Sequence, residues 1–395
     1  MNVGRVSPWH VGVTGAFTAA IFCLVRLVHL GGGAGTFVVA ARPFTDPATV
    51  PGHIPVAQSG GFDGQFFYRL ALDPTTVGLA RAHGVAFDYG VRGGRIGYPS
   101  LVWLVSIGGR AALVPTAMIV VNVIAVGMLA WVAAHLAADH GRAPLWGFAI
   151  AGYWGFGIVL GRDLSELVAA AAVFGALLLV GRGKFWWAGG AGIVAVATRE
   201  QAVLTLAAIA VGVVWFERRR SGWRPALVAA AKIAVPPAVC FLAWQAAVAR
   251  VIGELPATTS SRYNSTWPFT AFPGALSTWV RDAGEALSPA DGTSIGKVLP
   301  LLCFVALVWV VGAAVTSDGL RVVWVQRPWE VLAGAAALCV LVSSSTFVLK
   351  VPADFRQSYE AAGCAWLVLW LSTGSRSWWA LLIVAPVTAV VLAFR

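Results

Sequence analysis

Residues 61–74 read GFDGQFFYRLALDP and lie in the one long polar interval between the first apolar segment of the chain and all the others. A short helix is expected to begin at Asp63, because its carboxylate can accept hydrogen bonds from the N–H groups two and three residues further on. Pro74 disfavours helical geometry at Asp73 and so ends the helix. Apolar side chains recur along it at helical spacing, which gives it an apolar face. In the alternative interpretation, Asp63 does no more than cap this helix.

The composition is that of an integral membrane protein. Of the 395 residues, 58% are hydrophobic and only 11% are charged, whereas charged residues make up about 25% of a typical soluble domain. The net charge of +11 does not indicate a nucleic-acid partner, because the basic residues come in small groups between apolar runs. The five cysteines fall inside apolar runs without ligand-like spacing, so neither disulfides nor a zinc site are expected. In such a protein the helix at 61–74 is expected to lie on the membrane surface.

Apolar runs long enough to cross a bilayer, about 17–25 residues, set the predicted architecture. The longer runs lie near residues 11–30, 113–136, 144–160, 164–181, 226–249, 298–316, 329–348, 358–373 and 377–394. Two shorter runs, 186–198 and 202–216, are expected to form a pair rising to the outer side, while 96–108 does not cross. The sequence therefore predicts a single all-α polytopic domain over residues 1–395 with about 11 transmembrane helices. A long first outer loop at 31–112 carries short interfacial helices and Asp63, and a second outer loop covers 250–297.

The distribution of Lys and Arg orients the chain. With the N-terminus in the cytoplasm, the inner helix ends carry eleven Lys and Arg residues and the short outer connections carry four. The unusual charged residues then fall at the outer ends of helices: Asp63, Arg69, Asp73, Arg95, Asp163, Glu166, Arg199, Glu200, Asp354 and Arg356. Because charges in a membrane are costly, this convergence predicts a functional site on the extracytoplasmic face of a multi-pass cell-membrane protein.

Structural alternatives exist for the acidic pair and for the charged turn. Asp163 and Glu166 share one face at the top of a helix, where first-turn acids also complement the helix dipole. Arg199 and Glu200 separate two helices too short to span the bilayer comfortably, so we expect them inside a cavity below the outer surface. The alternative is a salt bridge, mutual or with a neighbour, that fixes the turn.

The loops supply candidate groups for a phosphate and a sugar. Arg95 follows two glycines that free the backbone, and its guanidinium is a planar, bidentate phosphate donor. Arg262 and Tyr263 open a stretch of aromatic and hydrogen-bonding residues suited to a sugar. Arg69 and Arg95 are alternatively no more than solvated loop charges.

The order of these residues resembles the GT-C superfamily of integral membrane glycosyltransferases. In that superfamily the first outer loop carries an essential acid followed by an aromatic-rich helix, and Asp63 ahead of residues 66–68 matches this position. A helix started by Ser-Glu and a later Gly-rich short helix ending in Thr-Arg are also typical. Glu166 follows Ser165, and Arg199 follows Thr198, in that order along the chain.

A late outer Asp-x-Arg-x-x-Tyr motif extends the resemblance. It is present as Asp354, Arg356 and Tyr359, although the first two could also be an ordinary interfacial pair. Many superfamily members have two adjacent acids in the first loop, whereas Gly64 follows Asp63 here. We therefore expect no cofactor and do not favour a divalent metal.

The resemblance implies an inverting glycosyltransferase, similar to the small bacterial mannosyltransferase-like members that act in cell-envelope biosynthesis. It would move one sugar from a polyprenyl-phosphate-linked donor to a lipid- or glycan-linked acceptor, with membrane lipids around it and Asp63 as general base. The predicted substrate-binding residues are Arg69, Arg95, Tyr98, Asp163, Glu166, Arg199, Glu200, Arg262, Tyr263, Asp354, Arg356 and Tyr359. The alternatives are a transporter or flippase of lipid-linked saccharides and a scaffold subunit without catalysis.

Overall fold

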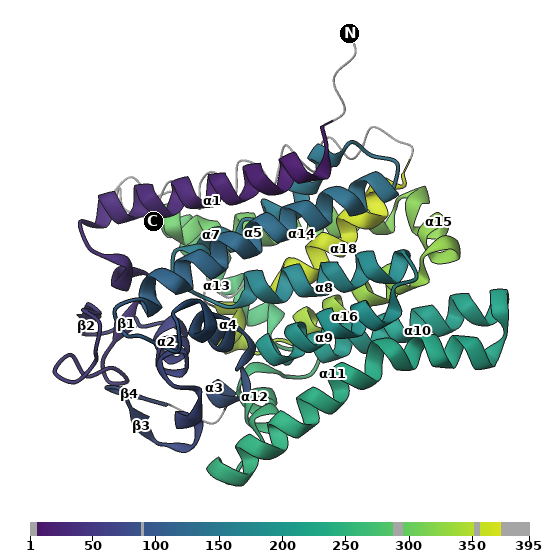
Figure 1. Ribbon diagram of the computed structural model, residues 1–395. Coiled ribbons are helices and arrows are strands. Elements are labelled where there is room, and N and C mark those ends of the chain that lie inside the picture. The colour runs from purple at the N-terminus through teal and green to yellow at the C-terminus, as the bar shows by residue number, and fades with distance from the viewer. Residues whose placement is uncertain (1–5, 88–90, 287–294, 351–355, 373–395) are drawn as a thin grey trace.

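The computed structural model describes residues 6–87, 91–286, 295–350 and 356–372, and within them the chain is a layered bundle of helices (Figure 1). The strands of the described part are confined to the first loop. They form two short pairs, β1 (Ala40–Ala41) parallel to β2 (Val56–Ala57) and β3 (Arg81–Ala82) antiparallel to β4 (Val85–Ala86). This confirms the helical class predicted from the sequence.

The described residues contain four helices that are long and apolar enough to cross a membrane. They are α1 (Pro8–Leu30), α5 (Val114–Asp139), α11 (Trp223–Ile252) and residues 298–315 of α14 (Ile295–Val315). A fifth span is formed if α15 (Asp318–Gln326) and α16 (Pro328–Val342), which meet at an angle of 116°, are counted as one broken helix. The protein is thus a helical membrane protein. The number of about 11 crossings stays a prediction, and the expected span 377–394 lies outside the described residues.

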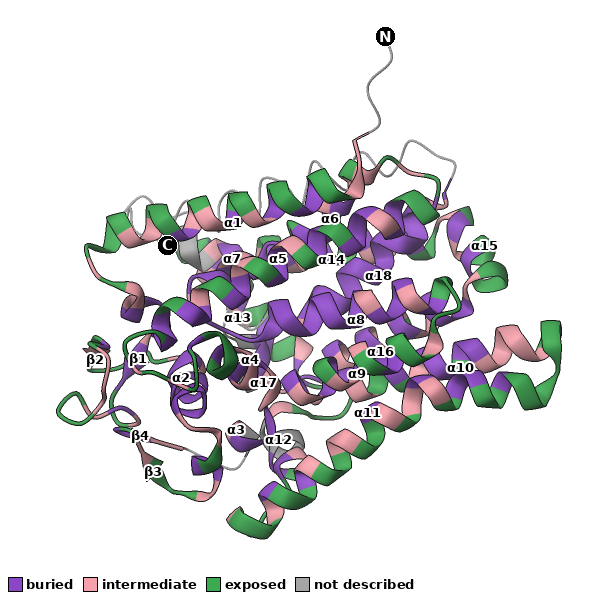
Figure 2. Ribbon diagram, viewed as in Figure 1, coloured by how far each residue is buried: buried purple, intermediate pink, exposed green. Residues whose placement is uncertain are grey.

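Further helices complete the bundle. Two apolar ones are α8 (Glu166–Gly181) and α9 (Phe185–Thr198). The others are α10 (Ala202–Ser221), α12 (Pro256–Asn264), α13 (Phe272–Ala286), α17 (Thr346–Lys350) and α18 (Tyr359–Trp370). The main helix pairs are α5 on α8, α8 on α9, and α10 on α11. Figure 2 shows α8 buried along most of its length, whereas α1 and α11 expose apolar side chains to the surroundings of the bundle.

The single helix predicted at 144–160 is wrong. The chain forms η3 (Pro144–Gly147), α6 (Phe148–Ala151) and α7 (Gly155–Leu160) instead, because the several glycines of this segment disfavour a continuous helix. Gly155 also has a packing role: a Cβ atom on it would lie 2.7 Å from the Cα atom of Arg356. The break therefore brings α7 into close backbone contact with the segment that precedes α18.

The first loop folds against one end of the bundle. It contains η1 (Ala34–Val38), α2 (Gly64–Leu72), η2 (Pro74–Gly78), α3 (Val91–Gly94) and α4 (Gly97–Val105). All nine residues of α2 are buried, and the ring of Phe67 meets that of Tyr98 on α4 edge-on at 5.6 Å. The prediction that this helix lies on the membrane surface is wrong, because the helix is enclosed on both sides: Phe67 packs on α4, and Phe66 packs on Phe44 and Phe87 of the loop itself.

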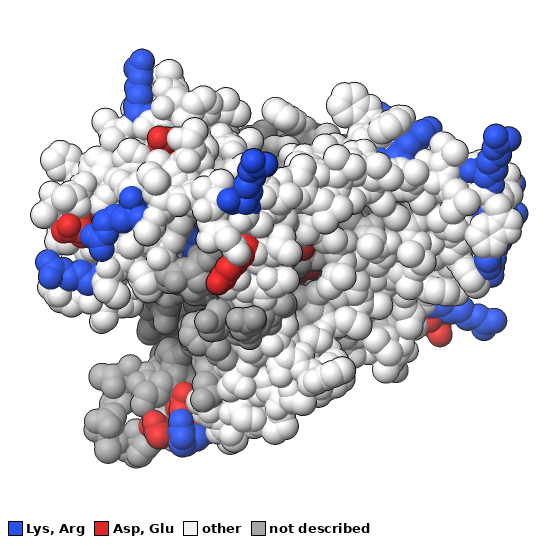
Figure 3. Space-filling model, turned by 90° about the horizontal axis from the view of Figure 1, so that it is seen from below, with Lys and Arg blue, Asp and Glu red and all other residues white. Residues whose placement is uncertain are grey.

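The exposed charges gather at the two ends of the bundle, with an uncharged band between them on the face shown in Figure 3. One end carries the first loop. The other, which we call the arginine-rich end, carries Arg142, Arg182, Lys184, Arg218, Arg219, Arg220, Arg224, Arg321 and Arg327. α5 connects the two ends, since its start packs near α2 and α4 and its last residue, Asp139, lies 3.6 Å from Arg182.

This separation of charges gives a test of sidedness. In a variant whose five cysteines are replaced, a cysteine at Ser59, exposed in the first loop, should react with a membrane-impermeant maleimide in intact cells. A cysteine at Ser221, exposed at the arginine-rich end, should react only after permeabilisation. Labelling of both positions from the same side would refute the orientation.

Candidate active site

Asp63 meets two arginines at the start of α2. Its Oδ1 atom lies 2.6 Å from Nη1 of Arg92, and its Oδ2 atom lies 3.2 Å from Nη1 of Arg95. The backbone carbonyl of Asp63 accepts the N–H groups of Phe66 and Phe67, but its side chain makes no capping hydrogen bond. The expected side-chain cap is therefore wrong. The carboxylate faces the arginines, and 16% of the side chain stays exposed.

Arg95 connects the first loop to the turn between α9 and α10. Its Nε and Nη2 atoms donate to the two carboxylate oxygens of Glu200 at 2.9 and 2.7 Å, a bidentate pair, while Nη1 contacts Asp63. Only 7% of its side chain is exposed. Arg95 is thus a buried bridge between two carboxylates, not a solvated loop charge.

Glu166, at the start of α8, receives two further arginines. Its Oε1 atom lies 2.8 Å from Nη2 of Arg199 and 2.6 Å from Nε of Arg356, and all three side chains are almost fully buried. Arg199 follows α9 and Arg356 precedes α18, so the pair closes the bundle around the start of α8. The sequence predicts that the charged turn either lies in a cavity or is fixed by a salt bridge. Its two charged residues form ion pairs with other segments, Arg199 with Glu166 and Glu200 with Arg95, and their side chains are 3% and 16% exposed.

These seven residues act as one electrostatic unit, which we call the carboxylate–arginine cluster: Asp63, Arg92, Arg95, Glu166, Arg199, Glu200 and Arg356. Burial by itself would raise the pKa of Asp63, but the four arginines outweigh it and hold the pKa at about 2. Arg95 and Arg199 likewise hold the pKa of Glu200 below its usual range against the effect of burial. With four arginines and three ionised carboxylates, the described cluster carries one positive charge in excess (4 − 3 = +1).

The segment before α18 adds neutral polar groups beside the cluster. Gln357 accepts a hydrogen bond of 3.0 Å from Gln201 in the charged turn. The hydroxyl of Tyr359, a predicted site residue, donates to Glu360 at 2.9 Å, and Glu360 also accepts from Thr205. The two described members of the predicted Asp-x-Arg-x-x-Tyr motif, Arg356 and Tyr359, therefore lie at or beside the cluster. Asp354, its first member, lies outside the described residues.

Arg69 and Tyr98 lie away from the cluster and have structural partners. The Arg69 guanidinium donates to the backbone carbonyls of Thr76, Leu79, Ala80 and Val85 and stacks on the ring of Phe87. It fixes the loop that follows α2. The Tyr98 hydroxyl donates to the carbonyl of Met118 and accepts from the amide of Asn122, which holds α4 on α5. Both residues thus stabilise elements of the first loop and do not contact the cluster carboxylates in the described structure.

Asp163 is buried beside the cluster without a hydrogen-bond partner among the described residues. It lies in the turn between α7 and α8 with φ +47° and no exposed surface, and neither carboxylate oxygen has a partner. Burial raises its pKa well above the usual range, and the charge of Arg26 only partly opposes this. Burial therefore shifts the pKa of Asp163 in the direction opposite to that of the cluster carboxylate Asp63, whose arginine contacts lower it.

The second outer loop approaches the cluster through α12. This helix packs against α3, which carries Arg92. The side chains of Arg262 and Tyr263 lie outside the described part, so their predicted contact with a sugar stays a prediction. Arg92 is not among the predicted substrate-binding residues, although it precedes Arg95 by three residues in the same glycine-containing stretch.

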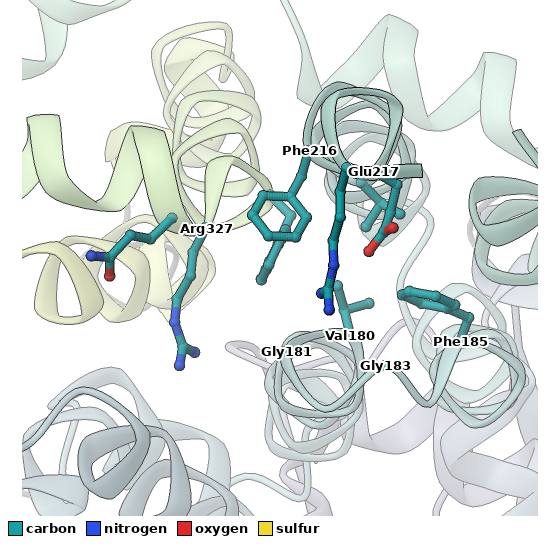
Figure 4. A pocket seen from close by; sticks show the side chains of 11 residues that line it. Val180, Gly181, Gly183, Phe185, Phe216, Glu217 and Arg327 are labelled. Carbon is teal, nitrogen blue, oxygen red and sulfur yellow. The ribbon is translucent and has the colours of Figure 1, made fainter. Parts of the chain in front are cut away.

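A separate pocket of 320 Å³ lies at the arginine-rich end. Figure 4 shows Phe185, Phe216, Glu217 and Arg327 around it. Arg327 is held by Glu330 at 3.2 Å and by the carbonyl of Asp139 at 3.1 Å. The predicted site residues are not among those that line it, so this pocket is distinct from the candidate site.

Two further findings bear on the chemistry. Within the described ranges, no three His, Cys, Asp or Glu side chains gather closely enough to hold a metal ion, and the prediction that no metal is needed stays a prediction. No family model matches the chain, and neither curated proteins nor solved structures give a match. The resemblance to GT-C enzymes thus depends on the residues themselves.

The burial of the cluster predicts the effect of breaking it. Glu166→Gln leaves Arg199 and Arg356 buried without their shared charge, and should lower the free energy of unfolding by about 3–5 kcal/mol. Chemical denaturation in detergent, followed by tryptophan fluorescence, measures this change. The matched control is Glu285→Gln, which removes an exposed partner of Arg281 and should change stability by less than about 1 kcal/mol. Equal, small effects of both variants would refute a tightly coupled buried cluster.

Proposed function

We propose that the protein is a glycosyltransferase that moves one sugar from a polyprenyl-phosphate-linked donor to the hydroxyl of a lipid- or glycan-linked acceptor. The observation that carries this proposal is the carboxylate–arginine cluster, drawn from five separate segments to one end of a membrane bundle. It combines arginines for a phosphate with a partly exposed carboxylate for a proton. Both groups are needed to displace a phosphate from a sugar carbon.

The donor phosphate is bound by Arg92 and Arg95, which lie beside the partly exposed Asp63. The side chains of Arg92 and Asp63 are 13% and 16% exposed, whereas that of Glu166 is only 1% exposed. A phosphate that approaches from the loop side therefore meets Arg92 and Arg95 first. Planar guanidinium groups bind phosphate oxygens in a bidentate manner, and the one excess positive charge of the described cluster favours an anion there.

Binding of the phosphate changes the state of Asp63. While Arg92 and Arg95 contact it, the pKa of about 2 makes this carboxylate a weak base. A phosphate that draws the two guanidinium groups to itself removes this stabilisation, so the pKa of Asp63 rises. Asp63 is then free to accept a hydrogen bond from the acceptor hydroxyl.

The transfer is a single displacement. The acceptor oxygen forms a bond to the anomeric carbon as the bond from that carbon to the phosphate oxygen breaks, which inverts the configuration. The hydroxyl proton passes to Asp63, and the electron pair of the broken bond leaves with the polyprenyl phosphate. Its charge grows from that of a diester to that of a monoester, so the arginines stabilise the transition state more than the bound donor.

Asp63→Asn should reduce transfer by at least about 100-fold, because the amide keeps the size of the side chain but cannot accept the proton. The assay is transfer of label from a panel of radiolabelled polyprenyl-phosphate sugars to membrane acceptors by the purified protein. Asp73→Asn is the matched control: this acid of the same loop hydrogen-bonds to Thr75 at the start of η2, outside the cluster, so activity should be retained. A variant at Asp63 with more than about a tenth of normal turnover would exclude the base role.

Arg95→Lys should lower kcat more than it raises KM for the donor. Lysine keeps the charge but cannot hold Glu200 and a phosphate oxygen with one planar group, so the loss is largest where phosphate charge develops. Steady-state kinetics, normalised to folded protein, distinguish the two parameters. Arg81→Lys, an exposed cation of the same loop, serves as control and should leave both unchanged. If Arg95→Lys turns over normally, the donor phosphate is not bound by Arg95.

A further inference from the structure

An apolar groove of 560 Å³ lies on the bundle between α4, α5, α8 and α9. α8 contacts both α5 and α9 and lies between them in the ribbon view, so it forms the floor of the groove (Figure 1). The volume falls within the range of about 300–1,000 Å³ that is usual for ligand pockets. The groove begins at Leu101 of α4 and Val168 of α8, and it reaches Arg182 and Lys184 at the arginine-rich end.

Small residues keep this groove open. Ala171, Ala172 and Gly175 of α8 line its floor, with Ala125 of α5 and Ala191 of α9 on its walls. A Cβ atom added to Gly175 would meet nothing within 4 Å. Helix faces rich in small residues usually allow two helices to approach closely. Here no described segment fills the space above Gly175, so the face is left for an occupant from the membrane.

The two cations at the end of the groove indicate what this occupant carries. Arg182 binds Asp139 and His135 on one side while its side chain stays 36% exposed. Lys184 is exposed, and its side chain makes no hydrogen bond or ion pair within the described ranges. Cations at the end of a helix follow from its dipole and from membrane topology. Neither explains why they adjoin an apolar groove, which is the arrangement that an anionic headgroup and its acyl chain require.

We propose that this groove holds one acyl chain of an anionic phospholipid, whose phosphate is bound by Arg182 and Lys184. The inference does not rest on the transferase function. The lipid is distinct from the sugar donor, because the arginines of the carboxylate–arginine cluster do not line the groove. The two described cations that line it, Arg182 and Lys184, lie at the other end of α8. Electrostatic attraction of this kind favours phosphatidylglycerol over zwitterionic phosphatidylcholine.

The test uses the full chain, reconstituted in phosphatidylcholine nanodiscs that contain a minor fraction of phosphatidylglycerol, then transferred to detergent and examined by native mass spectrometry. The unaltered protein should retain one phosphatidylglycerol molecule selectively. Gly175→Phe fills the groove without a backbone clash and should abolish retention. Gly190→Phe is the matched control, since a Cβ atom at this exposed position of α9 also meets nothing and the residue does not line the groove.

A second variant keeps the groove open and removes the charges. Arg182→Gln combined with Lys184→Gln should retain a lipid but lose the preference for phosphatidylglycerol, and should abolish the rise in Tm that added phosphatidylglycerol gives the unaltered protein. Three results would overturn the proposal: equal lipid retention by Gly175→Phe and the unaltered protein, a dimer without lipid that Gly175→Phe dissociates, or displacement of the phosphatidylglycerol by a polyprenyl phosphate. The first result would mean that the groove holds no lipid. The second would assign the groove to a second copy of the chain, and the third would assign it to the sugar donor.

Discussion

The bidentate pair between Arg95 and Glu200 is the interaction on which the rest of the site depends. It joins the first loop to the turn between α9 and α10, and through its third nitrogen Arg95 also holds Asp63. The backbones beside it are close: a Cβ atom on Gly97 would lie 2.8 Å from the backbone nitrogen of Thr198. A charged group that is 7% exposed must be paired to remain ionised. The first loop therefore has to dock on the turn between α9 and α10 for Arg95 and Glu200 to keep their charges.

The stability of the fold does not explain such a cluster. A buried ion pair roughly balances its own desolvation, and apolar residues of similar volume often stabilise a protein as well or better. The bundle has many apolar contacts of its own at the interfaces of α5, α8 and α9. Loss of one member of the cluster is costly, but the whole set adds little to the free energy of folding. We therefore relate the cluster to the proposed reaction and not to stability. Asp163 is buried close to the cluster, has no hydrogen-bond partner among the described residues and has a raised pKa, so neighbouring carboxylates of this protein lie in very different environments.

Much of this arrangement could be predicted from the sequence, because hydropathy and local capping signals are short-range. The helix after Asp63 and the convergence of Glu166, Arg199 and Arg356 agree with the predicted order, whereas α10 has 20 residues and extends beyond the short run predicted for it. The burial of α2 could not be predicted, since spacing shows that a face is apolar but not what covers the other face. The same limit applies to Arg69, whose partners are backbone carbonyls contributed by the loop after it.

The electrostatics of the cluster also impose an order on the proposed reaction. Before the donor arrives, Asp63 is held at a pKa of about 2 by positive charge and is a poor proton acceptor. An acceptor hydroxyl that binds first therefore finds no effective base. Only a ligand with competing negative charge can draw Arg92 and Arg95 away, and the phosphate of the donor is such a ligand. The ion pairs that close the site in the unliganded protein thus make activation of the base conditional on the arrival of the group that will leave.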